Sequence, residues 1–214
     1  MLRSAALLGV GGLVACTGDS PTATGTADPA TGPSAERPAG GNSATLMVYF
    51  SRAGENYWNG GRRVLEEGNT AVIAAMIADL TGVDTYRIEA ADPYPTDYEQ
   101  TVQRNTAELQ RDARPAIATP PPPLANYQMI LLGSPVWAVR EPMVMRTFID
   151  TVDLAGKTIH PFVTYAVSQL GNVVDNYRER CPGATVTDGL AIRGEQAQQS
   201  ESEVLAWLTG LGLR

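Results

Sequence analysis

Residues 46–54, LMVYFSRAG, place an apolar run directly before a short polar loop, and residues 68–70, Gly-Asn-Thr, follow after an insertion. The apolar run predicts a buried β-strand, and the second fragment opens a helical pattern. A helix N-terminus attracts anions because its first amides lack partners and its dipole favours negative charge. The two fragments therefore predict one phosphate site, with the backbone amides and the side chains of Ser51, Asn69 and Thr70 as donors.

The motifs that are missing narrow the kind of phosphate ligand. The sequence contains no G-x-x-x-x-G-K-[ST] motif and no G-x-G-x-x-G motif, which argues against a nucleotide triphosphatase and a dinucleotide-binding domain. No lysine is needed, because hydrogen bonds to a charged partner contribute about 1.5–3 kcal/mol each. A flavin that carries a phosphate, FMN, is therefore the predicted cofactor.

Residues 45–214 have the length of one ordinary domain and alternate strand and helix patterns. This alternation predicts an α/β fold, a three-layer doubly wound five-stranded parallel sheet in the order 2-1-3-4-5, with its ligand crevice at the carboxyl ends of the strands. Strands are expected at residues 46–50, 83–89, 128–132, 158–166 and 185–190. Helices are expected at residues 71–82, 98–109, 142–149 and 173–180, and after a Ser200–Glu203 capping box.

The start of the chain predicts export and a lipid anchor. Residues 1–15 contain one early arginine and an apolar stretch that is too short to span a bilayer, as in a signal peptide. Residues 13–16, Leu-Val-Ala-Cys, resemble a bacterial lipobox, which implies cleavage before Cys16 and diacylglycerol on its sulfur. The alternative is an ordinary signal peptide with an accidental cysteine.

Residues 16–44 are rich in Thr, Pro, Gly, Ser and Ala and nearly free of large apolar side chains. Such a segment cannot bury enough surface to order itself, so it is interpreted as a lipid-anchored disordered linker. The expected location is the cell membrane, lipid-anchored, on the extracytoplasmic face. The domain of residues 45–214 would then act outside the cytoplasm.

Composition limits the other functions. A formal charge of −7 and a pI near 4.7 weigh against nucleic acid and favour a neutral or cationic partner. His160 is the only histidine and Cys181 the only cysteine besides Cys16, which argues against a zinc or iron–sulfur site. No G-x-S-x-G motif supports a serine hydrolase, and no catalytic acid or base is predicted.

Two further loops belong to the same edge of the predicted sheet. Residues 133–138, Gly-Ser-Pro-Val-Trp-Ala, follow the third strand, and residues 164–171, Thr-Tyr-Ala-Val-Ser-Gln-Leu-Gly, follow the fourth. With these loops the chain resembles the short-chain flavodoxin family, from Leu46 to roughly Arg193. That family combines a Ser-Arg-x-Gly-Asn-Thr phosphate loop, a Gly-x-Pro-x-Trp loop beside the flavin, and a glycine-rich loop after the fourth strand.

The resemblance implies a set of FMN-binding residues. The phosphate contacts would come from Ser51, Arg52, Ala53, Asn69 and Thr70. The flavin would lie against Ser134, Pro135, Val136, Trp137 and Ala138, with Trp137 stacked on its ring, and against the loop Ser168, Gln169, Leu170 and Gly171. Two features depart from the family: residues 55–67 interrupt the phosphate loop, and residues 169–171 replace the glycine-rich run.

The functional prediction is electron or hydride transfer by FMN, with a small-molecule or protein redox partner. Two roles stay open, a one-electron carrier and a reductase of quinones or other small acceptors. The alternative from another class is a flavin-free lipoprotein that binds a solute or a cell-envelope partner. For three aromatic residues, two placements are possible. Trp137 either stacks on a ligand or caps the core. Tyr57 and Trp58 lie either over the flavin or on the surface near the first helix.

Overall fold

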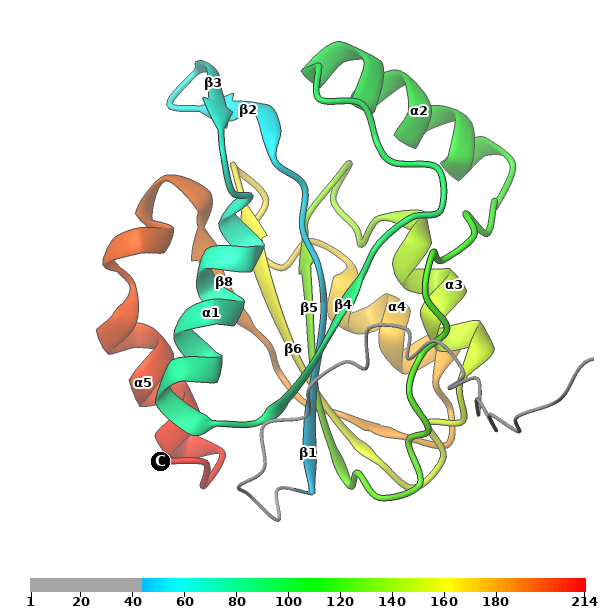
Figure 1. Ribbon diagram of the computed structural model, residues 1–214, viewed down its shortest axis with the longest axis vertical. Helices are drawn as coiled ribbons and strands as arrows, with labels where there is room; N and C mark the ends of the chain where they lie inside the picture. Colours follow the sequence, from blue (N-terminus) through cyan, green and yellow to red (C-terminus); the bar gives the residue numbers. More distant parts are fainter. Residues whose placement is uncertain (1–43) are drawn as a thin grey trace, which may run out of the picture. The chain divides into compact units, whose positions relative to one another are not determined.

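The structure is a computed structural model and describes residues 44–214 (Figure 1). The predictions for the signal peptide, Cys16 and the linker as far as residue 43 lie outside the described residues. The main sheet contains β1 (Thr45–Phe50), β4 (Asp84–Ile88), β5 (Met129–Pro135), β6 (Thr158–Tyr165), β7 (Thr185–Val186) and β8 (Leu190–Arg193). The helices are α1 (Asn69–Thr81), α2 (Tyr98–Gln110), α3 (Met143–Thr151), α4 (Val173–Arg180), the 3₁₀ helix η1 (Gly194–Gln199) and α5 (Glu201–Gly210).

The sheet is parallel throughout, in the order β4-β1-β5-β6, and β7 and β8 both pair with β6. Helices α1 and α5 cover one face, and α3 and α4 cover the other (Figure 1). Neighbouring residues of β5 alternate between the two apolar cores: Ile130 and Leu132 belong to one and Leu131 to the other. The three-layer α/β fold and the strand order 2-1-3-4-5 are confirmed.

Helix α1 ends as its sequence predicts. Gly82 follows the last turn with φ of 66°, in the left-handed region that favours glycine, and its N–H donates to the carbonyl of Ala78. No helix within residues 44–214 is long and apolar enough to cross a membrane.

The fifth strand differs from the prediction. A single strand at residues 185–190 was expected, but two short strands occur, β7 and β8, with β8 reaching Arg193. The interruption lies opposite His160 and Pro161 of β6, since β7 pairs with Thr158–Ile159 and β8 with residues 162–165. Because proline has no N–H, it cannot donate to a neighbouring strand.

Two helix predictions were wrong in detail. The buried face of α2 is polar, formed by Thr101, Asn105 and Glu108, whereas Val102 is 41% exposed. Ser200 forms no side-chain cap, because η1 leads directly into α5 and the Ser200 hydroxyl donates to the carbonyl of Ala197 (2.8 Å).

The insertion at residues 55–67 is a β-hairpin rather than an irregular loop. Strand β2 (Gly54–Trp58) pairs antiparallel with β3 (Gly61–Leu65). The turn residues Asn59 and Gly60 both have positive φ, 47° and 85°, as a type I′ turn requires. Asn-Gly is the strongest short-range signal for a hairpin, and the prediction missed it.

His160 is buried in β6, and its Nδ1 lies 2.8 Å from the Thr187 hydroxyl. Burial lowers the pKa of His160, so the folded protein binds a proton here less readily than the unfolded chain. The resulting stability is present above the unfolded pKa of about 6.5 and is lost as the pH falls below it.

We therefore expect the free energy of unfolding to decrease between pH 7 and pH 5.5, and to decrease less in a His160→Gln variant. Urea unfolding of both proteins at the two pH values measures this difference. Equal slopes would contradict it, and no other histidine contributes.

Candidate functional site

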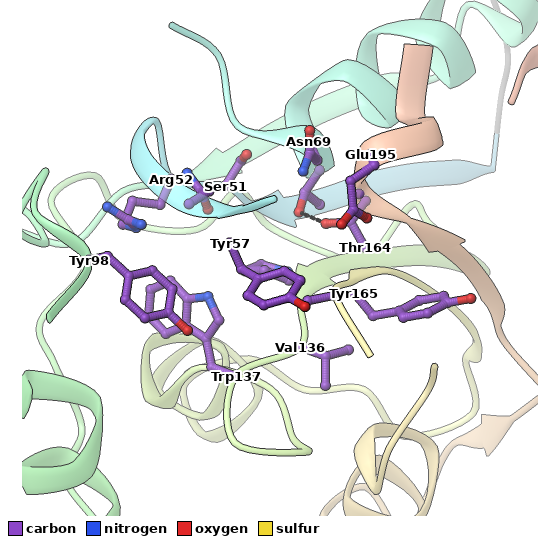
Figure 2. A pocket seen from close by; sticks show the side chains of 15 residues that line it. Ser51, Arg52, Tyr57, Asn69, Tyr98, Val136, Trp137, Thr164, Tyr165 and Glu195 are labelled. Carbon is purple, nitrogen blue, oxygen red and sulfur yellow. Dashed lines mark hydrogen bonds between the residues drawn. The ribbon is translucent and has the colours of Figure 1, made fainter. Parts of the chain in front are cut away.

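A cleft with a cavity volume of about 100 Å³ lies at the carboxyl ends of the parallel strands (Figure 2). Strands β1, β5, β6 and β8 each contribute residues that end the strand or directly follow it. The lining consists of Ser51, Arg52, Asn56, Tyr57, Asn69, Thr70, Tyr98, Pro135, Val136, Trp137, Thr164, Tyr165, Ala166, Gly194 and Glu195.

The two phosphate-loop fragments meet at the start of α1. The backbone N–H of Ala71 donates to Oγ of Ser51 (3.1 Å), so the end of β1 caps a helix that begins after the hairpin. Gly68 makes this contact possible, because a Cβ there would lie 2.4 Å from both the carbonyl oxygen of Arg52 and Oγ of Ser51. The insertion therefore leaves the loop intact in space although it interrupts it in sequence.

The same end of the cleft carries several donors. The amides of Asn69 and Thr70 are in the first turn of α1 and have no intrahelical partner. The Thr70 hydroxyl lies 2.7 Å from the Thr164 hydroxyl at the end of β6, and both residues are buried. Gly194 leaves room for the side chain of Asn69, since a Cβ would lie 2.4 Å from its Nδ2.

The guanidinium of Arg52 is largely engaged by backbone carbonyls. It donates to Pro95 (3.0 Å) and Thr96 (3.2 Å), and also to Glu55. Its Nε is buried without a hydrogen-bond partner within residues 44–214. Burial lowers the pKa of Arg52, and the charge of Glu55 opposes that shift. Arg52 thus ties the base of the hairpin to the segment before α2, and its contact with a phosphate stays a prediction.

Trp137 lies where the core meets the cleft. Its ring meets Phe50 (5.7 Å between centroids, 89°) and Tyr94 (5.2 Å, 77°) in edge-to-face contacts. These contacts fix the ring orientation while the side chain also lines the cleft. Trp137 therefore packs against the core, and its stacking on a ligand stays a prediction.

The turn that carries Trp137 has a strained backbone. Residues 137–140 close a tight turn through two hydrogen bonds between Trp137 and Arg140, with Ala138 at φ 47° and Val139 at φ 61°. Positive φ is rare for a β-branched residue and costs about 1–3 kcal/mol. Such strain is found where the surroundings hold a functional loop in place.

The loop after β6 supports this turn. The N–H of Asn172 donates to the carbonyl of Val139 (2.7 Å), and a Cβ at Gly171 would lie 2.3 Å from the same oxygen. Residues 168–171, expected beside the flavin, do not line the cleft. Their contact with a flavin stays a prediction.

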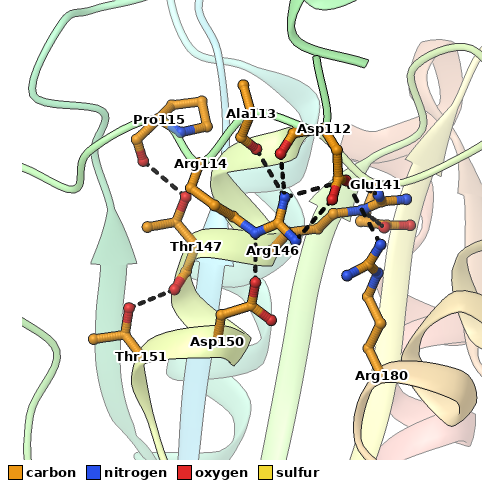
Figure 3. Close-up of polar contacts among 10 residues, drawn as sticks. All are labelled: Asp112, Ala113, Arg114, Pro115, Glu141, Arg146, Thr147, Asp150, Thr151 and Arg180. Carbon is orange, nitrogen blue, oxygen red and sulfur yellow. Dashed lines mark hydrogen bonds and ion pairs between the residues drawn. The ribbon is translucent and has the colours of Figure 1, made fainter. Parts of the chain in front are cut away.

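A buried ion network fixes the other end of the turn (Figure 3). Glu141 is 0% exposed and accepts from Nε of Arg146 and from Nδ2 of Asn176, both at 2.8 Å. Arg146 also pairs with Asp112 (2.9 Å), which is hydrogen-bonded to Arg114. The hydrogen bonds from Arg114 and Arg146 hold the pKa of Asp112 below its ordinary value.

Glu195 closes the opposite side of the cleft. Its Oε1 accepts from the backbone N–H of Asn59 at the hairpin tip (2.9 Å), and its Oε2 accepts from Arg193 (3.1 Å). Burial raises the pKa of Glu195, but the hydrogen bond from Asn59 and the charge of Arg193 outweigh it and lower the pKa. Glu195 is therefore an anion already supplied with donors.

Seven of the predicted site residues line the cleft: Ser51, Arg52, Asn69, Thr70, Pro135, Val136 and Trp137. Ala53 is half-buried beside the cleft and Ser134 is fully buried in β5. Ala138 lines a hollow of about 270 Å³ between its turn and α2. This hollow continues the cleft, because Trp137 and Tyr98 line both.

Sequence reasoning did not assign a site role to Asn56, Tyr98, Tyr165, Gly194 or Glu195. Tyr98 was assigned to the apolar stripe of a helix, and Glu195 lies beyond the predicted end of the fifth strand. Tyr165 had a signal, since it directly follows the apolar run of a parallel strand. Among the described residues no group of three His, Cys, Asp or Glu side chains is arranged to hold a metal ion.

Comparisons with known proteins agree with this geometry. The sequence profile of the family described as flavodoxin matches residues 64–211. Two candidate flavoproteins, from Bacteroides eggerthii and Bacteroides uniformis, have solved structures that are similar at 27% identity. The match to the Bacteroides eggerthii protein has a TM-score of 0.65 and covers 81% of this chain and 100% of that chain. The match to the Bacteroides uniformis protein has a TM-score of 0.62 and covers 78% of this chain and 98% of that chain.

A flavoprotein from Lactobacillus acidophilus, solved in complex with FMN, shares the fold at 21% identity and a TM-score of 0.54. The match covers 72% of this chain and 96% of that chain. No curated protein sequence matches the chain at a significant level.

Proposed function

Because this chain belongs to the flavodoxin family, a family of FMN-binding redox proteins, we propose that it transfers electrons or hydride through FMN held in the cleft between Ser51 and Trp137. The donor and the acceptor would be a small molecule or a redox protein that reaches the open side of the cleft. The isoalloxazine ring supplies the redox chemistry, so the protein residues need only bind, orient and shield it.

The residues present fit FMN at both ends of the cleft. At one end are the first amides of α1, the hydroxyls of Ser51 and Thr70, and the amide of Asn69. These are neutral donors at a helix N-terminus, the arrangement that favours a phosphate. At the other end, Trp137 and Tyr98 offer aromatic surface to a flat ring (Figure 2).

One observation carries the proposal: the absence of a side chain at Gly68 lets the start of α1 pack directly against Ser51 and Arg52. This contact joins two fragments that are separated in sequence into one anion site. The anion site lies in the same cleft as Trp137, so a ligand with a phosphate and an aromatic ring would engage both.

Reduction and reoxidation of the FMN-loaded protein test the redox function. We expect stoichiometric reduction by dithionite without air, followed by reoxidation on addition of a small quinone or ferricyanide. Bound FMN that is reduced and is then not reoxidised by any acceptor would contradict a transfer role and favour a binding role.

Trp137→Ala is expected to weaken FMN binding and to shift the flavin potential. Aromatic stacking is worth about 0.5–1.5 kcal/mol beyond burial, which corresponds to a roughly two- to twelvefold loss in affinity. Calorimetry and a potentiometric titration measure the two effects. Trp207→Ala, on the opposite face of the sheet against Phe162, is the control. An unchanged affinity and potential would place Trp137 in the core alone.

We further propose that the protein acts at the extracytoplasmic face of the cell membrane, anchored through Cys16. The support is the lipobox pattern of residues 13–16 and the composition of the segment that follows. Stable anchoring takes more than one acyl chain, which a lipoprotein cysteine provides.

Cys16→Ser is therefore expected to release the protein from the membrane fraction. Sedimentation after a high-salt wash measures this release. A variant that still sediments would contradict the lipid anchor, and Cys181→Ser is a matched control because that cysteine is buried in the domain.

A further inference from the structure

The β2–β3 hairpin spans the mouth of the cleft from one wall to the other. At its base, Oε2 of Glu55 accepts from the N–H of Tyr98, at the start of α2. At its tip, Asn59 donates to Glu195 in η1. The hairpin thus connects the two walls between which a ligand has to enter.

The side chain of Tyr57 extends from this hairpin into the middle of the cleft. Figure 2 shows its ring between the side of Trp137 and Tyr98 and the side of Tyr165. A ligand that lies against Trp137 has to pass Tyr57 or displace it. Trp58, the next residue, does not line the cleft and instead has the guanidinium of Arg63 over its ring at 4.5 Å.

The hairpin is firmly held at its base, whereas one charge-assisted hydrogen bond, from Asn59 to Glu195, holds its tip. The base is fixed by the buried Arg52, which donates to Pro95, Thr96 and Glu55. A Cβ at Gly54 would lie 2.6 Å from the carbonyl oxygen of Thr96, so this strand start is packed against the segment before α2.

The contacts of strand β3 with α2, made by Arg62, are individually weak. Arg62 pairs with Glu99 (3.0 Å), whose side chain is 68% exposed, and lies 3.5 Å from the centroid of the Tyr98 ring. Exposed ion pairs and cation–π contacts are each worth about 1 kcal/mol or less. Neither apolar core of the described residues includes a residue of the hairpin. A two-stranded hairpin without an apolar core opens at low cost.

From this arrangement we propose that the hairpin is a cover over the flavin site and that Tyr57 is the residue that controls passage. FMN enters and leaves when the tip lifts from Glu195 and Arg62 lifts from Tyr98. With the cover closed, Tyr57 admits small acceptors and excludes proteins. This inference rests on the proposed function and assigns a role to the insertion.

The kinetics of FMN binding to the full chain test the cover. A gate acts equally on entry and exit, so Tyr57→Ala is expected to raise the association and dissociation rate constants each by about tenfold, with less than about a threefold change in Kd. Stopped-flow measurements give the rates, and calorimetry gives Kd. Trp58→Ala, the neighbouring aromatic outside the cleft, should leave both rate constants within about twofold of the wild type.

Acceptor selectivity gives a second readout. The ratio of the reoxidation rate with cytochrome c to that with ferricyanide should rise at least about fivefold in Tyr57→Ala, because only the protein acceptor is excluded by the closed cover. A change in the dissociation rate constant alone, with an unchanged ratio, would make Tyr57 an ordinary contact residue and overturn the cover, while FMN binding would stand. A wild-type chain that binds no FMN would overturn both the cover and the proposed function.

Discussion

Replacing Glu141 by alanine is expected to lower the free energy of unfolding by about 3–5 kcal/mol, because the buried Arg146 loses its buried partner and keeps only the exposed Asp112. Glu141 is fully buried and holds Arg146, itself 5% exposed, through a 2.8 Å hydrogen bond. The loss is a large part of the about 5–15 kcal/mol that stabilises a typical domain. Urea unfolding at pH 7 measures it.

The control for this prediction is the exposed partner of the same arginine. Asp112 pairs with Arg146 at 2.9 Å but is 61% exposed, so Asp112→Asn should cost less than about 1 kcal/mol. If Glu141→Ala does not fold, Glu141→Gln keeps the shape and one acceptor and should show a smaller loss. Equal stabilities of the Glu141 and Asp112 variants would contradict the role of burial.

Gly68→Ala is expected to weaken FMN binding by about 100-fold or more. The added Cβ would lie 2.4 Å from the carbonyl oxygen of Arg52 and from Oγ of Ser51, so the helix start and the loop must separate. Gly68 has φ of −70°, which alanine adopts freely, and the effect is therefore steric. Losing two hydrogen bonds to a charged phosphate costs at least about 3 kcal/mol, or two orders of magnitude in Kd.

Riboflavin makes this experiment specific. It lacks the phosphate, so its affinity should change by less than about threefold in Gly68→Ala, whereas that of FMN falls. Gly210→Ala is the matched control, because nothing lies within 4 Å of the added Cβ. A parallel loss for both flavins would show a general distortion of the cleft rather than an opened phosphate site.

The sequence was sufficient for the elements with strong local patterns. Helix α4 has the predicted bounds. The parallel sheet and its strand order follow from the alternation of strand and helix patterns along the chain. The meeting of Ser51 with residues 68–70 was also predictable, since a strand end and a helix start in this fold share one edge.

Other features depend on contacts between distant parts of the chain. The guanidinium of Arg52 is turned toward carbonyls of residues 95 and 96, which no local pattern indicates. Glu195 enters the cleft because the fifth strand breaks opposite Pro161 and resumes as β8. The polar face of α2 is buried against its surroundings because Glu108 pairs with Arg104 and accepts from Tyr94.

For the β2–β3 hairpin, the sequence contains a turn signal, Asn59-Gly60, that did not lead to a hairpin prediction. Asn59-Gly60 is flanked by aromatic and basic residues rather than by alternating apolar ones, so the strands on either side lack a strand pattern. Their stability comes from pairing with each other and from Arg52 and Glu195, which lie outside the hairpin.

The split loop at Ser51 and residues 68–70 is expected to hold the phosphate of FMN. Calorimetric titration of the purified chain with FMN and with riboflavin, at the same pH and ionic strength, tests it most directly. We predict one FMN per chain, bound at least about 100-fold more tightly than riboflavin, because the phosphate contributes two or more charge-assisted hydrogen bonds. Equal affinities for the two flavins, or no binding of either, would contradict the account.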